Sequence, residues 1–130
     1  MMDTRTPAEG GFEPAPPERF TGPAWVKYGP GPADGSTTVV VVNFAPGSRT
    51  NWHSHHEGQY IYIVEGLGRV RSRGEAGAQA APGDIIWVPP GEWHFHGGTP
   101  ETPMVHFAFN GGGNPEWGEP VTDEEYGEGF

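Results

Sequence analysis

Residues 47–68, which read GSRTNWHSHHEGQYIYIVEGLG, decide the fold of this chain. A short strand carrying His53 and His55 is followed by a turn and then by an alternating strand that begins at Gln59. Side chains two residues apart on a strand point to the same face, so the two imidazoles lie together. The amide oxygen of Gln59 can reach back to the same point. This stretch therefore predicts neighbouring strands that bring polar donor atoms together.

The rest of the chain repeats this pattern of short apolar runs separated by turns. Its 22 glycines and 15 prolines fall between β-branched and aromatic runs, which is typical of a β-sandwich or barrel. Only Thr122, with Glu125 three residues later, forms a capping box that predicts a helical turn. We expect one all-β domain with strands over residues 24–28, 36–45, 51–55, 59–65, 69–73, 84–89, 92–96 and 102–110.

Two segments are expected to flank this barrel, which we place at residues 20–112. Residues 1–19 are rich in proline and poor in apolar side chains, so they predict a flexible N-terminal arm. Residues 113–130 are expected to form a C-terminal tail that packs on the barrel.

Charge and cysteine content exclude several classes of function. The net charge is −10, which argues against nucleic acid and against anionic membrane surfaces as partners. There are no cysteines, so disulfides and thiolate metal ligands are excluded. The chain shows no apolar leader and no apolar run of membrane-spanning length, and we expect it to be cytoplasmic.

All six histidines lie within residues 53–106. His94 follows the turn Pro89-Pro90-Gly91 at the start of another strand, where it can join the earlier donors. Three neutral imidazole nitrogens and one amide oxygen suit one divalent transition metal, such as Mn, Fe, Ni, Cu or Zn. The expected metal ligands are His53, His55, Gln59 and His94.

The order and spacing of these residues resemble the two sequence motifs of the cupin family. The run Gly47-(five residues)-His53-x-His55-(three)-Gln59-(six)-Gly66 resembles the first motif. The run Gly83-(five)-Pro89-x-Gly91-(two)-His94 resembles the second. Two positions differ: Gln59 stands where the family usually has Glu, and Gly98 where it often has Asn. The resemblance implies a jelly-roll β-barrel, usually a homodimer, with the metal inside the barrel.

Gln59 changes the charge expected at the metal. An ionised Glu would cancel one of the two positive charges of a divalent metal, whereas a neutral amide cancels none. The metal should therefore be a stronger Lewis acid and should resist oxidation to the trivalent state. This residue favours Lewis-acid chemistry over redox chemistry.

The chain also resembles small bacterial cupins with hydroxynitrile lyase activity. They share the His-x-His-(three)-Gln arrangement, the Pro-Gly-Glu-x-His segment, a histidine in the last strand and a C-terminal segment like residues 116–126. This resemblance implies cyanohydrin cleavage with manganese or iron as the cofactor, Ni, Zn and Cu being the other metals compatible with the ligands. It also implies that His106 is the general base, because an ordinary histidine pKa near ~6.5 suits proton transfer at neutral pH.

The pocket is expected to be small and apolar, which suits a compact organic molecule as the substrate. His106 shares a strand face with Asn110, and that face should look into the barrel. Arg49, just before the ligand strand, is expected to have a surface role. The candidate substrate contacts are Val40, Val42, Phe44, His96 and Asn110.

Three functions stay open from the sequence. A Lewis-acid lyase or isomerase acting on a small carbon–oxygen substrate is favoured by Gln59 and by the tail. An Fe- or Ni-dependent dioxygenase like quercetinase could use the same ligands. A non-catalytic cupin that binds a small molecule would show no turnover. The sequence favours an enzyme without deciding the matter.

Aromatic side chains on the outer face of the expected strands predict self-association. Tyr60, Tyr62, Phe107 and Phe109 alternate with the inward-facing positions, and a single barrel has no second layer to cover them. We therefore expect a homodimer.

Overall fold

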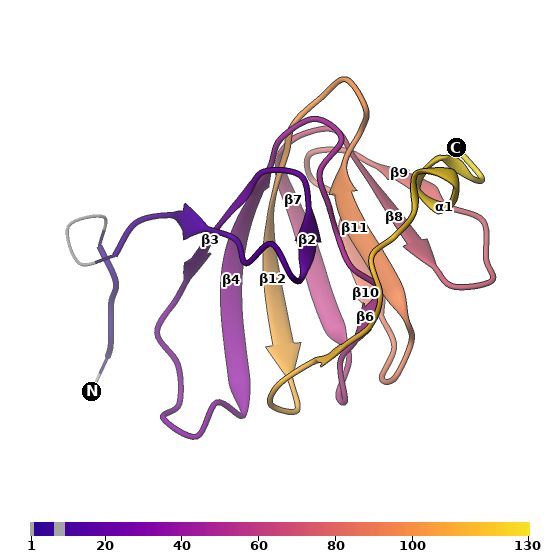
Figure 1. Ribbon diagram of the computed structural model, residues 1–130. Coiled ribbons are helices and arrows are strands. Elements are labelled where there is room, and N and C mark those ends of the chain that lie inside the picture. Colours follow the sequence, from indigo (N-terminus) through magenta and orange to yellow (C-terminus); the bar gives the residue numbers. More distant parts are fainter. Residues whose placement is uncertain (1, 7–9) are drawn as a thin grey trace.

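Two antiparallel sheets face each other in the computed structural model, which describes residues 2–6 and 10–130 (Figure 1). The first sheet has the strand order β1 (Glu13–Pro14), β3 (Ala24–Tyr28), β4 (Thr37–Phe44), β12 (Met104–Gly111), β7 (Gln59–Gly66) and β10 (Ile85–Val88). The second sheet contains β13 (Glu116–Trp117), β6 (His53–Ser54), β11 (His94–Gly98), β5 (Arg49–Thr50), β2 (Phe20–Thr21), β8 (Gly68–Ser72) and β9 (Ala78–Ala80). The predicted all-β fold class is confirmed.

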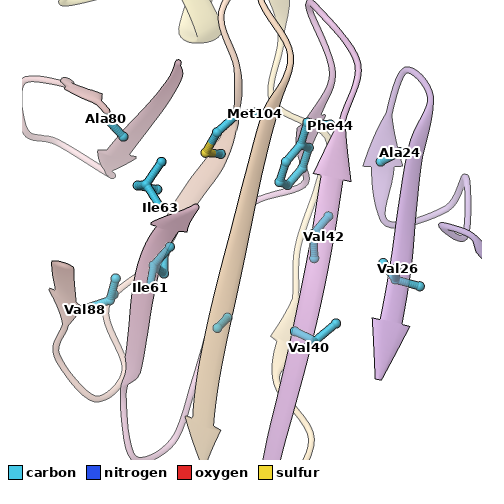
Figure 2. Packing of buried hydrophobic residues seen from close by; sticks show 11 residues of the cluster. Ala24, Val26, Val40, Val42, Phe44, Ile61, Ile63, Ala80, Val88 and Met104 are labelled. Atoms are coloured by element: carbon cyan, nitrogen blue, oxygen red, sulfur yellow. The ribbon is translucent and has the colours of Figure 1, made fainter. Parts of the chain in front are cut away.

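Burial alternates along the central strands, as a period of two requires. On β7 the side chains of Ile61 and Ile63 are fully buried, whereas Tyr60 and Tyr62 are exposed. The inward apolar residues of the first sheet form one layer that runs from β3 to β10 (Figure 2). This layer fills one part of the space between the sheets and leaves the histidines to fill another.

The register of β12 places His106 at the centre of the first sheet. His106 is the Cα partner of Val42 on β4 and of Ile63 on β7. The pairing with β7 is irregular between Val105 and His106, as at a β-bulge. Bulges re-aim side chains, and His106 here points inward and is fully buried.

The C-terminal segment packs on the second sheet and ends in helix α1 (Asp123–Gly127), which lies beside β8 and β9 (Figure 1). Thr122 caps this helix through the predicted capping box with Glu125. Val121 and Tyr126 are buried with two aromatic residues of the barrel, Trp52 and Phe95. No helix within the described residues is long and apolar enough to cross a membrane.

Arg49 corrects one prediction, because it is buried instead of having a surface role. Its guanidinium donates to the carbonyl oxygen of Val121 at 2.7 Å and forms an ion pair with Asp123 at 2.8 Å. It also lies over the ring of Tyr126, 4.6 Å from the centroid. A buried charge needs such partners, and the tail supplies them.

The N-terminal arm also differs in part from the prediction. Residues 1 and 7–9 lie outside the described residues, but β1 pairs with β3, with Glu13 opposite Val26. The carbonyl of Arg19 accepts a hydrogen bond from the Asn51 amide at 2.8 Å. This part of the expected flexible arm is therefore joined to the first sheet and to the segment between β5 and β6.

The strand expected over residues 51–55 is shortened to β6, because the first residues form hydrogen bonds with distant segments. The amide of Asn51 donates to Arg19, and that of Trp52 donates to the carbonyl of Glu119. Hydrogen bonds to two distant segments thus replace a regular ladder at this point. The short strand β9, which pairs with β8, lies between the strands expected over 69–73 and 84–89, where the sequence predicts no strand.

Candidate metal centre

The four predicted ligands lie together between the two sheets. His53 on β6 and His94 on β11 are Cα partners, and their ring centroids are 4.3 Å apart. Gln59 begins β7 in the opposite sheet, and its Oε1 lies 2.8 Å from Nε2 of His94. His55 follows β6, with its ring centroid 5.2 Å from that of His53 and 5.8 Å from that of His94.

Backbone hydrogen bonds tie the two ligand-bearing turns together. The carbonyl of His55 accepts from the amide of Gly58 at 3.2 Å and from that of Gly91 at 2.9 Å. Gly58 has a φ of 84°, and a Cβ there would lie 2.4 Å from the side chain of Trp87. Only glycine fits this turn without strain, so it fixes where Gln59 enters its strand.

Two backbone carbonyls determine which ring nitrogens face the centre. Nδ1 of His53 lies 3.0 Å from the carbonyl oxygen of Asn51, and Nδ1 of His94 lies 2.9 Å from that of Glu92. A carbonyl only accepts, so each Nδ1 must donate, and each neutral ring keeps a lone pair on Nε2. For His94 that lone pair faces the oxygen of Gln59, which is another acceptor. A cation between these atoms would satisfy both.

Other buried nitrogens at the centre have no hydrogen-bond partner among the described residues. Both ring nitrogens of His55 and Nε2 of His96 are buried without a hydrogen bond. Each buried polar atom left unpaired costs about 1–3 kcal/mol, so a group that accepts their lone pairs is implied. Candidate ligand atoms of His53, His94 and His96 lie within 4.8 Å of one another. The donor set fits a divalent transition metal.

Burial keeps these imidazoles in the form that binds metals. Removal from water lowers the pKa of His55 and of His94 to about 4. The pKa of His53 lies well below 6.5, first because of burial and then because of repulsion from a charge on His94. His96 is affected in the same way by burial and then by His106. All four rings are therefore neutral at neutral pH.

His106 lies next to the histidine cluster, on the side of the first sheet. Its Nε2 is 2.9 Å from Nδ1 of His96, and its Nδ1 has no partner. Burial lowers the pKa of His106 to about 4, below the ordinary value expected from the sequence, so the ring is neutral at neutral pH and is a weaker base than expected. In the part of the chain that the structure describes, no hydrogen bond joins it to the four predicted ligands. The arrangement suits a proton acceptor that is not itself a ligand.

A cavity of about 160 Å³ opens beside the histidines. Four of the five predicted substrate contacts line it: Val40, Val42, His96 and Asn110. Phe44 differs, because it is fully buried behind the histidines. Its ring centroid lies 5.4 Å from that of His106 and 5.9 Å from that of His96. Phe44 therefore supports the cavity wall through these two rings.

Sequence reasoning missed the residues at the terminal segments that complete the cavity. Arg19 and Phe20 come from the N-terminal segment, and Trp117 comes from β13. The Trp117 ring stacks on His53, with centroids 4.7 Å apart and an interplanar angle of 24°. No local pattern marks these residues, because their positions depend on pairing between distant segments.

The chain shares its sequence features with a known family and a curated relative. The family described as Cupin domain matches residues 40–109. A protein from Granulicella tundricola named (R)-mandelonitrile lyase is 43% identical over 88 residues, which are 65% of this chain and 67% of that protein.

Solved structures share the fold. A cupin-like protein from Thermotoga maritima has a TM-score of 0.81 and 36% identity, over 87% of this chain and 89% of that chain. A cupin 2 conserved barrel domain protein from Rhodopseudomonas palustris is 14% identical, with a TM-score of 0.70 over 95% of this chain and 87% of that chain. At that identity the likeness concerns the fold alone.

Proposed function

Because this chain belongs to the cupin family, we propose that it is a metal-dependent lyase that cleaves small cyanohydrins. The observation that carries the proposal is a set of neutral imidazoles with nitrogens that have no hydrogen-bond partner among the described residues, next to the buried, neutral ring of His106. The name of the relative from Granulicella tundricola supports the substrate class.

Different residues of the site would bind the metal, bind the substrate and transfer the proton. His53, His55, Gln59 and His94 would hold manganese or iron, which would supply a Lewis acid for the substrate oxygen. Val40 and Val42 line the cavity and pack against the organic part of the substrate. The contact with His96 holds the ring of His106 in position.

The cleavage itself needs one proton acceptor. His106 takes the proton of the cyanohydrin hydroxyl, and the electron pair left on oxygen forms the carbonyl bond. The bond to the cyano carbon breaks, and cyanide leaves with the bonding pair. Cyanide then takes up the proton, so the products are an aldehyde and hydrogen cyanide.

The assay for this function uses racemic mandelonitrile and protein loaded with manganese or iron. We expect metal-dependent release of benzaldehyde, followed by absorbance, together with an equal amount of cyanide. A loaded protein that leaves mandelonitrile intact but consumes oxygen with a flavonol would favour the dioxygenase instead. Metal without either reaction would favour a non-catalytic binding protein.

Changing Gln59 to Glu is expected to lower lyase turnover while the metal stays bound. The carboxylate cancels one charge of the metal, so we expect kcat for mandelonitrile to fall about tenfold or more. Metal content and kcat should be measured on the same samples. Gln79→Glu makes the same charge change on an exposed residue of β9 and should leave kcat unchanged. An unchanged or higher kcat in Gln59→Glu would contradict the charge argument.

We also propose that the protein is a homodimer formed through the outer face of the first sheet. Tyr60 pairs with Trp87 on β10 and with Phe109 on β12, and Tyr62 pairs with Phe107. All five side chains are exposed, and they form one apolar patch across three strands. Such a patch on a monomer favours association, and a second copy of the same face can cover it symmetrically.

Replacing Tyr62 with Lys tests this interface. A buried charge at the centre of the patch should weaken association at least about thirtyfold. Sedimentation equilibrium should give wild type at twice the chain mass of 14.0 kDa and Tyr62→Lys at the mass of one chain. Leu67→Lys changes an exposed apolar residue in a turn and should stay dimeric. A wild-type monomer at micromolar concentration would overturn the dimer.

A further inference from the structure

The charge of the cavity is opposite to that of the whole chain. The sequence contains 17 acidic residues and has a net charge of −10. Yet none of the described residues that line the cavity is Asp or Glu, and one of them, Arg19, is cationic. The candidate metal ligands are also neutral, so no protein carboxylate lining the cavity would offset a bound cation. The electrostatic potential inside should therefore attract anions.

Arg19 is held at the cavity by its backbone. Its amide donates to the carbonyl of Pro16 at 3.0 Å, and its carbonyl accepts from Asn51, two residues before the ligand His53. The guanidinium carbon lies 5.3 Å from the centroid of the Trp117 ring, which stacks in turn on His53. Arg19 and His53 thus contact the same ring in the cavity lining, which places a cation near the candidate metal centre.

The guanidinium of Arg19 is available to a ligand. The ion pairs among described residues are formed by Arg49, Arg71 and Arg73. Arg19 is solvent-exposed and makes no such pair. A guanidinium that stacks on an aromatic ring keeps its edge free, and that edge matches a carboxylate with two parallel hydrogen bonds.

We propose that the cavity binds a compact organic carboxylate whose charged group pairs with Arg19. The apolar part of the ligand packs against Val40 and Val42, and its other oxygen faces the candidate metal centre. The volume of about 160 Å³ suits a ligand with one ring, because a cavity of about 150 Å³ accommodates benzene. This inference names the substrate class of the proposed lyase. Turnover of such a substrate rests on the proposed function, whereas its binding does not.

Isothermal titration calorimetry on the metal-loaded protein tests the pairing with two matched ligands. The probes are 4-formylbenzoate and its uncharged amide, 4-formylbenzamide, which have nearly the same size. At low salt we expect wild type to bind the carboxylate about tenfold more tightly. The preference should shrink as salt is added, because Arg19 is exposed.

The variant Arg19→Gln distinguishes the contribution of the arginine to binding from that of the metal. It should bind the two probes equally, with the metal content and unfolding temperature of wild type. Lys27→Gln removes the same charge from the outer side of β3, and it should keep the preference. Equal binding of both probes by wild type would overturn the proposal, and so would a preference that survives in Arg19→Gln.

The outcome is separate from that of the proposed function. A wild-type protein that prefers the carboxylate but does not cleave mandelonitrile would refute the lyase and leave this inference standing. A protein that cleaves mandelonitrile without preferring the carboxylate would support the lyase and refute this inference.

Discussion

Replacing His53 with Ala is expected to reduce the bound metal from about one per chain to less than about a tenth of that. His53 offers a fixed lone pair on Nε2, because the carbonyl of Asn51 binds its other nitrogen. Its ring stacks on Trp117 and lies tilted against the ring of His94. The variant loses a preorganised ligand as well as these ring contacts. Elemental analysis of purified protein measures the result, and mandelonitrile turnover should fall more than about a hundredfold.

His56 provides the matched control for this experiment. It lies in the same turn, one residue after His55, but it is exposed. His56→Ala should keep the metal and the activity of wild type. Full metal content in His53→Ala would show that the centre does not need this residue. A wild-type protein that holds no metal even after reconstitution would refute the lyase function and favour a cupin that only binds a small molecule.

Replacing His106 with Gln is expected to abolish most of the lyase activity without removing the metal. General base catalysis contributes roughly 10²–10⁴-fold, and kcat for mandelonitrile should fall by that factor. The metal should stay, because in the described part of the chain the hydrogen bond of His106 is with His96 and not with any of the four predicted ligands. Parallel measurements of kcat, metal content and unfolding temperature separate the lost base from a damaged fold.

Two other outcomes would each change the assignment. Unchanged turnover in His106→Gln would place the base elsewhere in the cavity. Loss of metal together with turnover would show that His106 acts by holding His96 in a ligand position. His56→Gln makes the same substitution at an exposed site and should leave both quantities at the wild-type level.

The sequence by itself determined the fold class, the longer strands of the barrel and the convergence of the predicted ligands. These features depend on local rules. Alternation fixes which side chains share a face, so His106 points inward and Tyr62 outward. The spacing of two residues between His53 and His55, and the turn before Gln59, are short-range as well. His94 follows a second turn, Pro89-Pro90-Gly91, and the likeness to the cupin motifs supports its place among the predicted ligands.

The tertiary structure alone decided what surrounds the ligands. Arg19 and Trp117 reach the cavity only because the terminal segments pair with the second sheet, at Asn51 and at β6 respectively. Arg49 is buried because Val121 and Asp123 lie over it, although they are more than 70 residues away in the chain. Phe44 has the expected inward orientation, but the histidines stand between it and the cavity. Such contacts join segments that no periodicity or motif relates, so their positions follow from packing of the whole chain.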